Sequence, residues 1–504
     1  MYHYYVIHVI QKEAAMPVPE SIRRHKPEGF GALEIRCFDG DKFYVYRVSS
    51  VYDEKKGRPR KVTGRSIGKI TEADGFIPNA EGMRLIQERK AAAVVTVRNH
   101  GAYEVLSTLS PDLEERLKAH FPDVWRNIRA FSLIRLVDKA SPRMAQHAYD
   151  ASTFPGDIPH GENTIRAFVR RLGGMGDRIA AFLRDGVEPG RTLLFDGTTI
   201  FTRSTDSLAE RGYNPEGSLN TQARMLYVFE EESRKPVFYR ILQGSVVDRT
   251  AFIETVRESG CRDCTVIADK GFYSKTNLSA LMEAGLRFIL PLQANTRLLD
   301  DDFVSDMDDH KFDSAFAYHG RVIWHRKTSV GDRGNWLYVF RDDERRQQLQ
   351  TRMVERIEKL CGEGVEGEKP MDILDEKRTG YYAMVSNIDA DAREIFLSYK
   401  ARWDIEQCFD YLKNDVEPMA SHARDNDYFR GMMFLNHIAL VYYYGLVNAV
   451  RNSSLKGSWT PEEVIALAKN IYLVEEDGRK RLSEIPGKTR QVLAEIGVDI
   501  TLKP

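Results

Sequence analysis

The chain has 504 residues, of which 42% are hydrophobic and 29% are charged, and its 73 basic and 74 acidic residues give a net charge of −1. This composition is ordinary for a folded globular protein and argues against a long disordered tract. The balanced charge does not by itself indicate a nucleic-acid partner, although it can hide local basic segments. A chain of this length is predicted to hold a central domain with attached modules.

Three features bear on the compartment. The five cysteines are few and odd in number, which fits a reducing cytoplasm better than a disulfide scaffold. Met1–Gln11 has neither a basic leader nor a long apolar run, so it is predicted to form a strand rather than a signal peptide. Gly431–Val450 is uncharged and long enough to span a bilayer, but its polar residues favour a buried helix. We therefore expect a cytoplasmic protein with no membrane partner.

A basic hairpin is predicted near the N-terminus. Short strands are expected at Ala32–Phe38, Phe43–Val51 and Arg65–Ile70, and the run Asp53–Gly64 between the last two is expected to be a turn. A basic hairpin tip is suited to contact DNA phosphates, although a solvated loop that serves solubility explains the same residues equally well. The basic residues of this run are Lys55, Lys56, Arg58, Arg60 and Lys61.

Residues 75–190 show apolar spacings of three and four, which predict a helical region. One of its helices carries Arg166, Arg170 and Arg171, which either lie along a DNA backbone or form the wet face of an amphipathic helix. The expected helices are Pro111–His120, Val124–Ala140, Thr164–Leu172 and Asp177–Arg184.

Strands dominate after Arg191. The predicted order is three strands, a helix, a strand, a helix and a strand, which is the order of a ribonuclease-H-like core. The fold class is therefore α/β, with a mixed β and α-helical N-terminal region for which DNA binding is one of the two interpretations given above. The expected strands are Thr192–Phe201, Met225–Glu230, Pro236–Leu242, Thr265–Asp269 and Arg287–Leu292, and the helices are Asp248–Ser259 and Lys275–Ala284.

A β-rich insertion is expected to interrupt this core. It is followed by a strand at Tyr381–Ser386 and a long helix from Asp391 to about Asp415. The predicted regions are a β-rich basic region (1–75), a helical DNA-binding region (76–190), the core in two parts (191–293 and 381–450), the insertion between them (294–380) and a C-terminal helical region (451–504).

Two aspartates are placed for metal chemistry. Asp196 stands inside the apolar strand Leu193–Thr198, where burying a charge is costly unless a cation faces it. Asp269 follows the apolar run Val266–Ala268, where a buried strand meets a glycine-containing turn. In the predicted core these strands are neighbours, so their carboxylates lie side by side. Two such like charges favour divalent cations between them.

The long helix carries a stripe of polar residues. Arg402, Glu406 and Lys413 follow Tyr399 at offsets of 3, 7 and 14, which places all four within an arc of about 60° on an α-helix. A surface ion pair between Arg402 and Glu406 explains only two of the four residues and neither aspartate. A carboxylate flanked by cations and a tyrosine suits a site that binds metal and phosphate.

The pattern Tyr-x2-Arg-x3-Glu-x6-Lys, formed by Tyr399, Arg402, Glu406 and Lys413, resembles the signature of transposases in the bacterial insertion-sequence-four superfamily. The resemblance covers about 191–450, and the stretch 51–70 is similar too. Further similar stretches are Phe195-Asp196-Gly197-Thr198-Thr199, Ala268-Asp269-Lys270-Gly271-Phe272-Tyr273, Arg211-Gly212-Tyr213 and Gly244-x3-Asp248.

The resemblance implies that Asp196, Asp269 and Glu406 bind two Mg²⁺ ions, with Mn²⁺ as a substitute, for cleavage and strand transfer at DNA ends by a cut-and-paste route. Arg402 and Lys413 would hold phosphates with Tyr399 beside them. The implied partners are double-stranded DNA, as terminal inverted repeats and target, and a second copy of the chain, in a bacterial cytoplasm at the nucleoid. Relatives also place a flipped base on an aromatic residue of the insertion, for which Trp324 and Trp336 are candidates.

Three other functions fit parts of the pattern. A haloacid-dehalogenase-type phosphatase needs a nucleophilic aspartate two residues before Asp196, where the chain has Leu194. A zinc site at Cys261 and Cys264 lacks a second ligand pair at suitable spacing. The serious alternative is a catalytically silent DNA-binding protein derived from a transposase. The presence of all three acidic residues favours the active enzyme.

Overall fold

The structure is a computed structural model that describes residues 18–502, except residues 40, 54–56, 92–94, 155, 157, 202–209, 212–220, 244–247, 294–295, 300–308, 332, 363–378, 403–424 and 477. The chain forms two compact units. The first contains residues 1–96 with 474–480, and the second contains residues 97–473 with 481–504.

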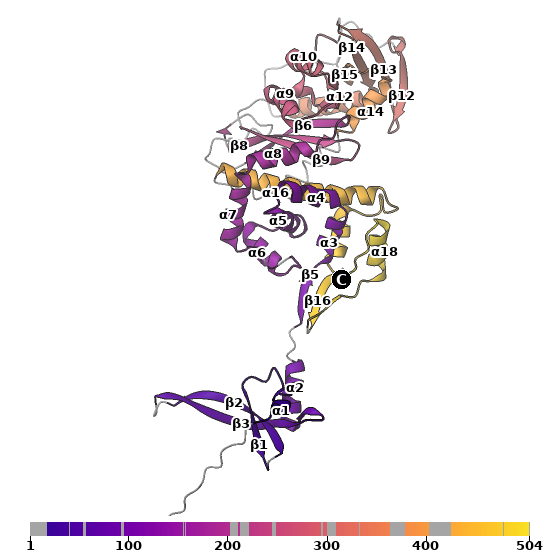
Figure 1. Cartoon of the computed structure of the whole chain (residues 1–504). Coiled ribbons are helices and arrows are strands. Elements are labelled where there is room, and N and C mark those ends of the chain that lie inside the picture. Colours follow the sequence, from indigo (N-terminus) through magenta and orange to yellow (C-terminus); the bar gives the residue numbers. More distant parts are fainter. Residues whose placement is uncertain are drawn as a thin grey trace, which may run out of the picture. The chain divides into compact units, whose positions relative to one another are not determined.

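The first unit is a four-stranded antiparallel sheet with two helices (Figure 1). Its elements are α1 (Glu20–Arg23), β1 (Leu33–Phe38), β2 (Lys42–Asp53), β3 (Arg58–Thr71), β4 (Gly75–Pro78) and α2 (Ala80–Ala91), and the strands pair in chain order. Strand residues and Ile22 of α1 form a small apolar core on this sheet. Its buried residues are Ile22, Leu33, Val45, Ile67 and Ile70.

The hairpin of β2 and β3 is longer than the sequence predicts. The expected turn over Asp53–Gly64 is wrong in its second half, because the strands pair up to Asp53 opposite Arg58. Val62 and Thr63 are β-branched and favour an extended strand, which outweighs the polar composition of the run. The basic residues of this half therefore lie in a strand. Gly57, with a φ of +60°, lies in the connection that remains.

The second unit is built on a ten-stranded mixed sheet. Its strands are β6 (Thr192–Phe201), β7 (Glu210–Arg211), β8 (Thr221–Glu230), β9 (Lys235–Gln243), β10 (Thr265–Ala268), β11 (Arg287–Pro291), β12 (Ser314–Tyr318), β13 (Arg321–Val330), β14 (Asn335–Asp342) and β15 (Tyr381–Ser386).

The strand order positions the aspartates. β9, β8 and β6 are antiparallel neighbours, and β10 and β11 follow on the other side of β6 and run parallel to it. The prediction that the strands of Asp196 and Asp269 are neighbours is thus confirmed. β15 pairs with β11, and β14, β13 and β12 follow in order. The strands of the β-rich insertion therefore extend the central sheet.

Helices pack on this sheet and form a bundle beside it (Figure 1). The four helices predicted between residues 111 and 184 are confirmed, with ends shifted by at most two residues. The helices are α3 (Gly101–Thr108), α4 (Pro111–His120), α5 (Trp125–Asp138), α6 (Pro142–Asp150), α7 (Glu162–Gly173), α8 (Gly176–Asp185), α9 (Asp248–Ser259), α10 (Lys275–Glu283), α12 (Asp343–Gly362), α14 (Ala392–Lys400), α16 (Asn426–Arg451), α17 (Pro461–Ala468) and α18 (Gly487–Glu495), with short 3₁₀ turns η1 (Lys270–Phe272) and η2 (Asp309–Lys311).

The C-terminal stretch is not helical throughout, contrary to the prediction for residues 451–504. Besides α17 and α18 it contains β16 (Tyr472–Glu476) and β17 (Arg479–Leu482), which form a small sheet with β5 (Thr96–Asn99) in the order β17-β16-β5. β16 is the central strand of this sheet, and its residues Tyr472, Leu473 and Val474 are strand-favouring or apolar.

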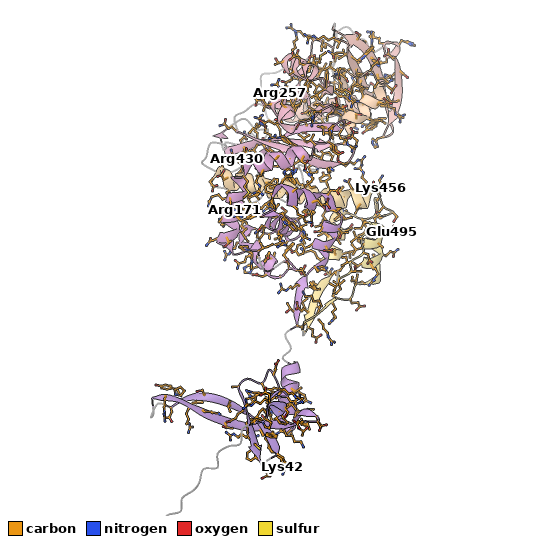
Figure 2. The ribbon with its side chains drawn as sticks, in the orientation of Figure 1. Lys42, Arg171, Arg257, Arg430, Lys456 and Glu495 are labelled. Atoms are coloured by element: carbon orange, nitrogen blue, oxygen red, sulfur yellow. The ribbon has the colours of Figure 1, made fainter. Side chains whose placement is uncertain are left out.

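The uncharged run Gly431–Val450 forms most of α16, and the predicted buried helix is confirmed. α16 is long and apolar enough to cross a membrane. However, 67% of its most apolar 18-residue segment is buried within the protein, as in the core helix of a globular domain. It contacts α5 and α7 on one side and β9 of the sheet on another, and it lies between bundle and sheet in Figure 1. Arg171 of α7 and Arg430 of α16, both labelled in Figure 2, are exposed.

Buried polar contacts fix α16 in place. Tyr227 Oη on β8 lies 2.6 Å from His437 Nδ1, and both side chains are buried. The Arg135 Nε–H group on α5 donates to Asn436 Oδ1 at 2.7 Å. Buried polar groups need such partners, because each one left without a partner costs about 1–3 kcal/mol. The bundle and the sheet are therefore held in a defined arrangement on either side of one helix.

We expect His437 to make the second unit less stable in acid. Burial, with a smaller contribution from Arg116, lowers the pKa of His437 to about 3 from its usual 6.5. Above pH 6.5 the imidazole is neutral in both the folded and unfolded states, so it costs nothing. Below pH 6.5 the unfolded chain binds a proton that the folded chain does not, and the free energy of unfolding falls by up to ~1.4 kcal/mol per pH unit until about pH 3.

The measurement is the free energy of unfolding of wild type and His437→Gln between pH 7 and pH 5, where carboxylates contribute little. A glutamine side chain does not titrate, so the wild type should lose stability more steeply over this window. Equal slopes for the two proteins would contradict a neutral buried His437.

Candidate active site

Asp196 and Asp269 are neighbours because of the register of two parallel strands. β10 pairs with β6 such that Ala268 lies opposite Phe195, so the next residue on each strand is one of the two aspartates. Asp196 continues in β6 opposite Tyr227 of β8, and its Oδ1 accepts a hydrogen bond from the Gly197 N–H at 2.8 Å. The sequence-based placement of the pair is therefore correct.

A guanidinium group lies between the two carboxylates. Arg402 Nη1 is 2.8 Å from Asp269 Oδ1 and 3.8 Å from Asp196 Oδ2. The side chains of Arg402 and Asp196 are only 12% and 14% exposed, while that of Asp269 is 33% exposed. This arginine is the cation that the buried Asp196 requires. A position between these two carboxylates is thus suited to positive charge.

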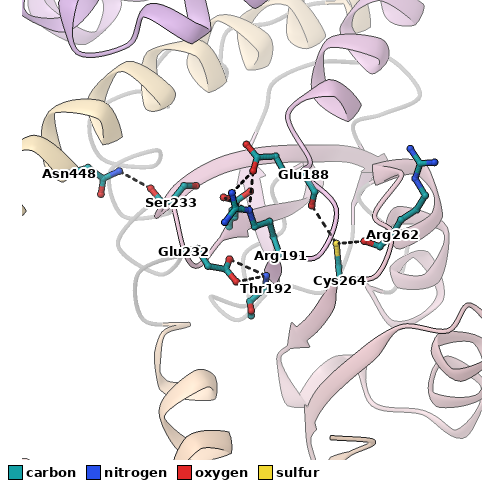
Figure 3. A network of polar contacts seen from close by, with 9 residues as sticks. Glu188, Arg191, Thr192, Glu232, Ser233, Arg262, Cys264 and Asn448 are labelled. Atoms are coloured by element: carbon teal, nitrogen blue, oxygen red, sulfur yellow. Dashed lines mark hydrogen bonds and ion pairs between the residues drawn. The ribbon is translucent and has the colours of Figure 1, made fainter.

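The other ends of β6 and β10 are fixed by polar contacts (Figure 3). The Thr192 N–H donates to both carboxylate oxygens of Glu232, at 2.9 and 3.0 Å. The Cys264 thiol, just before β10, donates to the Glu188 carbonyl oxygen at 3.6 Å. A slip of one residue in a strand would turn every side chain to the other face. These contacts help to hold the register that brings the aspartates together.

The helix that carries Tyr399 is described as far as Lys400, and the rest of the helix predicted to about Asp415 lies, from residue 403 on, outside the described residues. α14 begins after Asp391, whose side chain accepts from the Arg393 N–H, and ends at Lys400. The Arg402 N–H donates to the Tyr399 carbonyl oxygen at 3.2 Å, the three-residue spacing that is common in the last turn of a helix. The predicted Glu406 and Lys413 lie outside the described residues.

A cavity of about 440 Å³ opens beside Asp269. It is lined by apolar groups of the insertion, by aromatic groups of β15 and α14, and by cations next to the predicted motif residues. Lys270 follows Asp269 directly, and Lys400 follows Tyr399. Its remaining lining residues are Pro291, Leu292, Gln293, Leu299, Arg345, Leu349, Met353, Thr379, Gly380, Tyr381, Tyr382, Ala383, Met384 and Tyr399.

The sequence reasoning missed Lys270, Lys400 and Arg345 as residues of this cavity. The first two could have been found, because each directly follows a residue of the site. Arg345 belongs to α12, far away along the chain, and no local pattern marks it. Trp324 and Trp336, proposed for a flipped base, do not line the cavity. Arg341 lies over the ring of Trp324 at 5.5 Å and Lys327 over that of Trp336 at 4.5 Å.

The predicted DNA-contacting arginines of α7 differ in their surroundings. Arg166 pairs with Glu162 at 3.1 Å, and Arg170 pairs with Asp425 at 2.8 Å. Arg171 is exposed and lines a shallow hollow beside Trp125. Arg166 and Arg170 would have to give up these ion pairs to bind phosphates, which lowers the free energy gained from DNA binding. Arg171 is therefore the better placed of the three for an external anion.

Of the five basic residues predicted to contact DNA at the N-terminal hairpin, Lys55 and Lys56 lie outside the described residues. Arg58 and Arg60 are exposed on β3. Lys61 is also exposed, but its Nζ lies 2.8 Å from Glu34 Oε1, and this contact is the main reason why the pKa of Glu34 is lowered.

The aspartate pair fits a divalent cation. Carboxylate oxygens are the ligands that Mg²⁺ prefers, and the guanidinium of Arg402 already marks a cation position between Asp196 and Asp269. Among the described residues, no cluster of three or more His, Cys, Asp or Glu side chains could hold a metal ion. The third predicted ligand, Glu406, falls outside that part of the chain.

Comparison with known proteins assigns the family. The model of the family described as "Transposase DDE domain" matches residues 188–442, just over half of the chain. No curated protein matches in sequence. Among solved structures, the chain is similar to a piggyBac transposase synaptic complex with hairpin DNA (11% identity, 73% of this chain and 78% of that chain, TM-score 0.39). It is also similar to the Mos1 transposase paired-end complex (11%, 32% and 56%, 0.15) and the Drosophila P element transposase strand transfer complex (12%, 70% and 74%, 0.19).

Because each of these TM-scores is below 0.5, the assignment rests on the family match. The matched segment contains both aspartates, Tyr399, Arg402 and the predicted Glu406. The chain therefore belongs to the transposase DDE-domain family.

Proposed function

We propose that the protein cuts DNA at the ends of an insertion sequence and joins them to a target, by a cut-and-paste route that uses two metal ions. The observation that carries this proposal is the in-register pair Asp196 and Asp269 with Arg402 between them. Two carboxylates side by side on neighbouring parallel strands, in a chain of this family, suit hydrolysis and transfer of phosphodiesters.

In this proposal Asp196, Asp269 and Glu406 hold two Mg²⁺ ions, for which Mn²⁺ can substitute. The bound metal would activate an attacking oxygen and stabilise the leaving one. The chain's own contribution is to fix two ligands on neighbouring strands, which needs no rearrangement of the backbone. It also keeps one ligand, Asp196, largely shielded from water, where its charge is strongly felt.

The cations around the pair would hold the DNA backbone. Arg402 would move from the aspartates to a phosphate, with Tyr399 beside it and Lys413 further along. Arg402 already lies 5.7 Å from the Tyr399 ring centroid, so the two side chains act as one group. Guanidinium groups suit phosphates because they can donate two parallel hydrogen bonds.

We further infer a ribonuclease-H-like core, because the order β9-β8-β6-β10-β11 with its parallel half agrees with that arrangement. Membership of the insertion-sequence-four superfamily rests on the Tyr399, Arg402, Glu406 and Lys413 pattern. The proposed partners are terminal inverted repeats and target DNA, handled by a homodimer in the bacterial cytoplasm at the nucleoid. Pairing of two ends requires two copies of one active site.

A catalytically silent DNA-binding protein is the second candidate. The intact geometry of the aspartate pair favours the active enzyme, since a site that no longer binds metal has no need to keep two carboxylates together. The experiment uses duplexes from the DNA that flanks the gene, with Mg²⁺, and compares wild type with Glu406→Gln. The proposal predicts cleavage by wild type alone. Binding without cleavage by both proteins would favour the silent protein, and cleavage by both would remove Glu406 from the site.

Arg402 is expected to compete with metal in the absence of DNA. Its charge lies between the two carboxylates that would bind the cation. Two unit charges 4 Å apart near a protein surface interact with a Coulomb energy of ~4 kcal/mol, and screening by dissolved ions reduces this energy. Arg402→Gln should therefore bind Mn²⁺ roughly tenfold more tightly, which corresponds to ~1.4 kcal/mol.

Titration of the DNA-free protein with Mn²⁺, followed by electron paramagnetic resonance, measures this affinity directly. Arg393→Gln is the matched control, because it removes an exposed cation from α14, the helix that directly precedes Arg402. Unchanged or weaker Mn²⁺ binding by Arg402→Gln would show that the arginine does not occupy the metal position.

A further inference from the structure

We propose that the free end of the β2–β3 hairpin is a two-stranded ribbon that enters the major groove of double-stranded DNA. The ribbon consists of Ser49–Asp53 on β2 and Arg58–Val62 on β3. This inference deepens the proposed function by naming the element that recognises the DNA, and it concerns only the first unit of the chain.

The ribbon extends beyond the sheet to which it belongs. β1 pairs with β2 only from Phe38 opposite Lys42 to Leu33 opposite Arg47, and β4 pairs with β3 only over Gly68–Thr71. Beyond these points β2 and β3 pair only with each other, as the projecting hairpin in Figure 1 shows. The apolar core of the unit, which includes Val45 and Ile70, lies at the other end of the two strands.

Both faces of the ribbon are open to solvent. The side chains of Ser49–Tyr52 and of Arg58–Lys61 are exposed, and Val51 and Tyr52 are 54% and 64% exposed although both are large and apolar or aromatic. A two-stranded hairpin is only marginally stable on its own in water, and an exposed strand edge risks aggregation. An element with these costs is expected to gain stability from a partner.

The register sorts the side chains by face. Val51 lies opposite Arg60, and Asp53 lies opposite Arg58, so these four side chains share one face. The other face carries Tyr52 opposite Pro59 and Ser50 opposite Lys61, and Lys61 is held by Glu34. No ion pair with a described residue is found for Arg58 or Arg60. The first face therefore offers two cations beside the apolar side chain of Val51, with one carboxylate, Asp53, opposite Arg58.

These features fit duplex DNA better than a protein. The segment from Ser49 to Val62 has five basic and two acidic residues, so it is attracted to phosphates. Five residues of β-strand extend ~17 Å, about five base-pair steps. A two-stranded ribbon fits the major groove, which is about 12 Å wide, but not the minor groove of about 6 Å. Arginine is the residue that most often reads guanine there, and Val51 suits a thymine methyl group.

The test measures DNA binding by the full-length protein at several salt concentrations, with duplexes from the DNA that flanks the gene. Arg58→Ala/Arg60→Ala is compared with Arg23→Ala/Lys26→Ala, which removes two exposed cations of the same unit from around α1. The ribbon variant should bind at least about tenfold more weakly, and the slope of log K against log salt should fall by about 2, since each phosphate contact contributes about 0.9. The control should stay within twofold of wild type.

Protection of guanine N7 from methylation distinguishes the groove from the backbone. Wild type should protect N7 positions over about five base pairs, and Val51→Asp should lose this protection while the fold of the unit, followed by circular dichroism, is retained. Equal affinities and slopes for the ribbon variant and wild type would overturn the inference. So would protection confined to adenine N3, which is methylated in the minor groove. A change in oligomeric state with DNA binding intact would also overturn it and would indicate a protein partner.

Failure of this inference can be told from failure of the proposed function. Glu406→Gln tests cleavage and should keep the salt dependence of wild type. If wild type cleaves DNA and the ribbon variant binds it normally, the proposed transposase function is kept and the role of the ribbon is rejected. If the ribbon variant binds DNA more weakly but wild type does not cleave, the ribbon recognises DNA in a protein that is not an active transposase.

Discussion

Asp269→Asn is expected to reduce DNA-end cleavage by at least ~10³-fold, because loss of one catalytic group typically costs this much or more. Asparagine has the same shape as aspartate, so the turn after β10 should be kept. The change removes the charge that would hold a metal ion and that pairs with Arg402 at 2.8 Å. Cleavage of a labelled duplex by single-turnover kinetics measures the rate, and the affinity for the same duplex should change by less than twofold.

Asp263→Asn is the matched control. Asp263 lies near the opposite end of β10, is exposed, and has a φ of +56°, a conformation that asparagine also accepts. Its cleavage rate should equal that of wild type. A rate for Asp269→Asn within tenfold of wild type would contradict the role given to this carboxylate.

Gly431→Ala is expected to destabilise the second unit by about 3–5 kcal/mol, at the upper end of the range for single substitutions. A Cβ on Gly431 would lie 2.0 Å from the Val169 carbonyl oxygen of α7. A Cβ on Gly173 of α7 would lie 1.7 Å from the Asp427 carbonyl oxygen of α16. Both clashes involve backbone atoms, so the two helices must separate to accommodate a methyl group. The cost should appear as faster amide hydrogen exchange in α7 and α16 and a lower unfolding midpoint.

Gly176→Ala provides the comparison, since a Cβ at Gly176 meets no atom within 4 Å. It lies at the start of α8, where alanine is tolerated or slightly stabilising. Equal unfolding midpoints for the two alanine variants would show that the close approach of α7 and α16 is not required for stability.

The sequence predicted correctly those features that depend on neighbouring residues and on the chemistry of single side chains. Asp196 was recognisable because a carboxylate in an apolar strand needs a cation, and Asp269 because it ends a buried strand before a glycine. The helix around α16 could be predicted because its polar residues, such as His437, distinguish a buried helix from a membrane span. These inferences depend on a few neighbouring residues.

Long-range contacts could not be read in the same way. The Arg402 pairing with both aspartates joins residues more than 130 positions apart, and no local pattern marks it. The β-rich insertion looked separate, yet β14 pairs with β15 and extends the central sheet. Gly431 lies in a helix that looks continuous, and only the crossing with α7 reveals why a larger residue is excluded.

The most direct test of the central claim is strand joining. Wild type would be incubated with a duplex from the DNA that flanks the gene, ending in a 3′-OH at the proposed cleavage position, together with a supercoiled plasmid and Mg²⁺. The covalent product would be measured. The account predicts that wild type joins the end to the plasmid, whereas Asp196→Asn, Asp269→Asn and Glu406→Gln bind the duplex without joining it. Full binding but no joined product from wild type, in Mg²⁺ and in Mn²⁺ alike, would contradict it and would identify a DNA-binding protein that does not catalyse transfer.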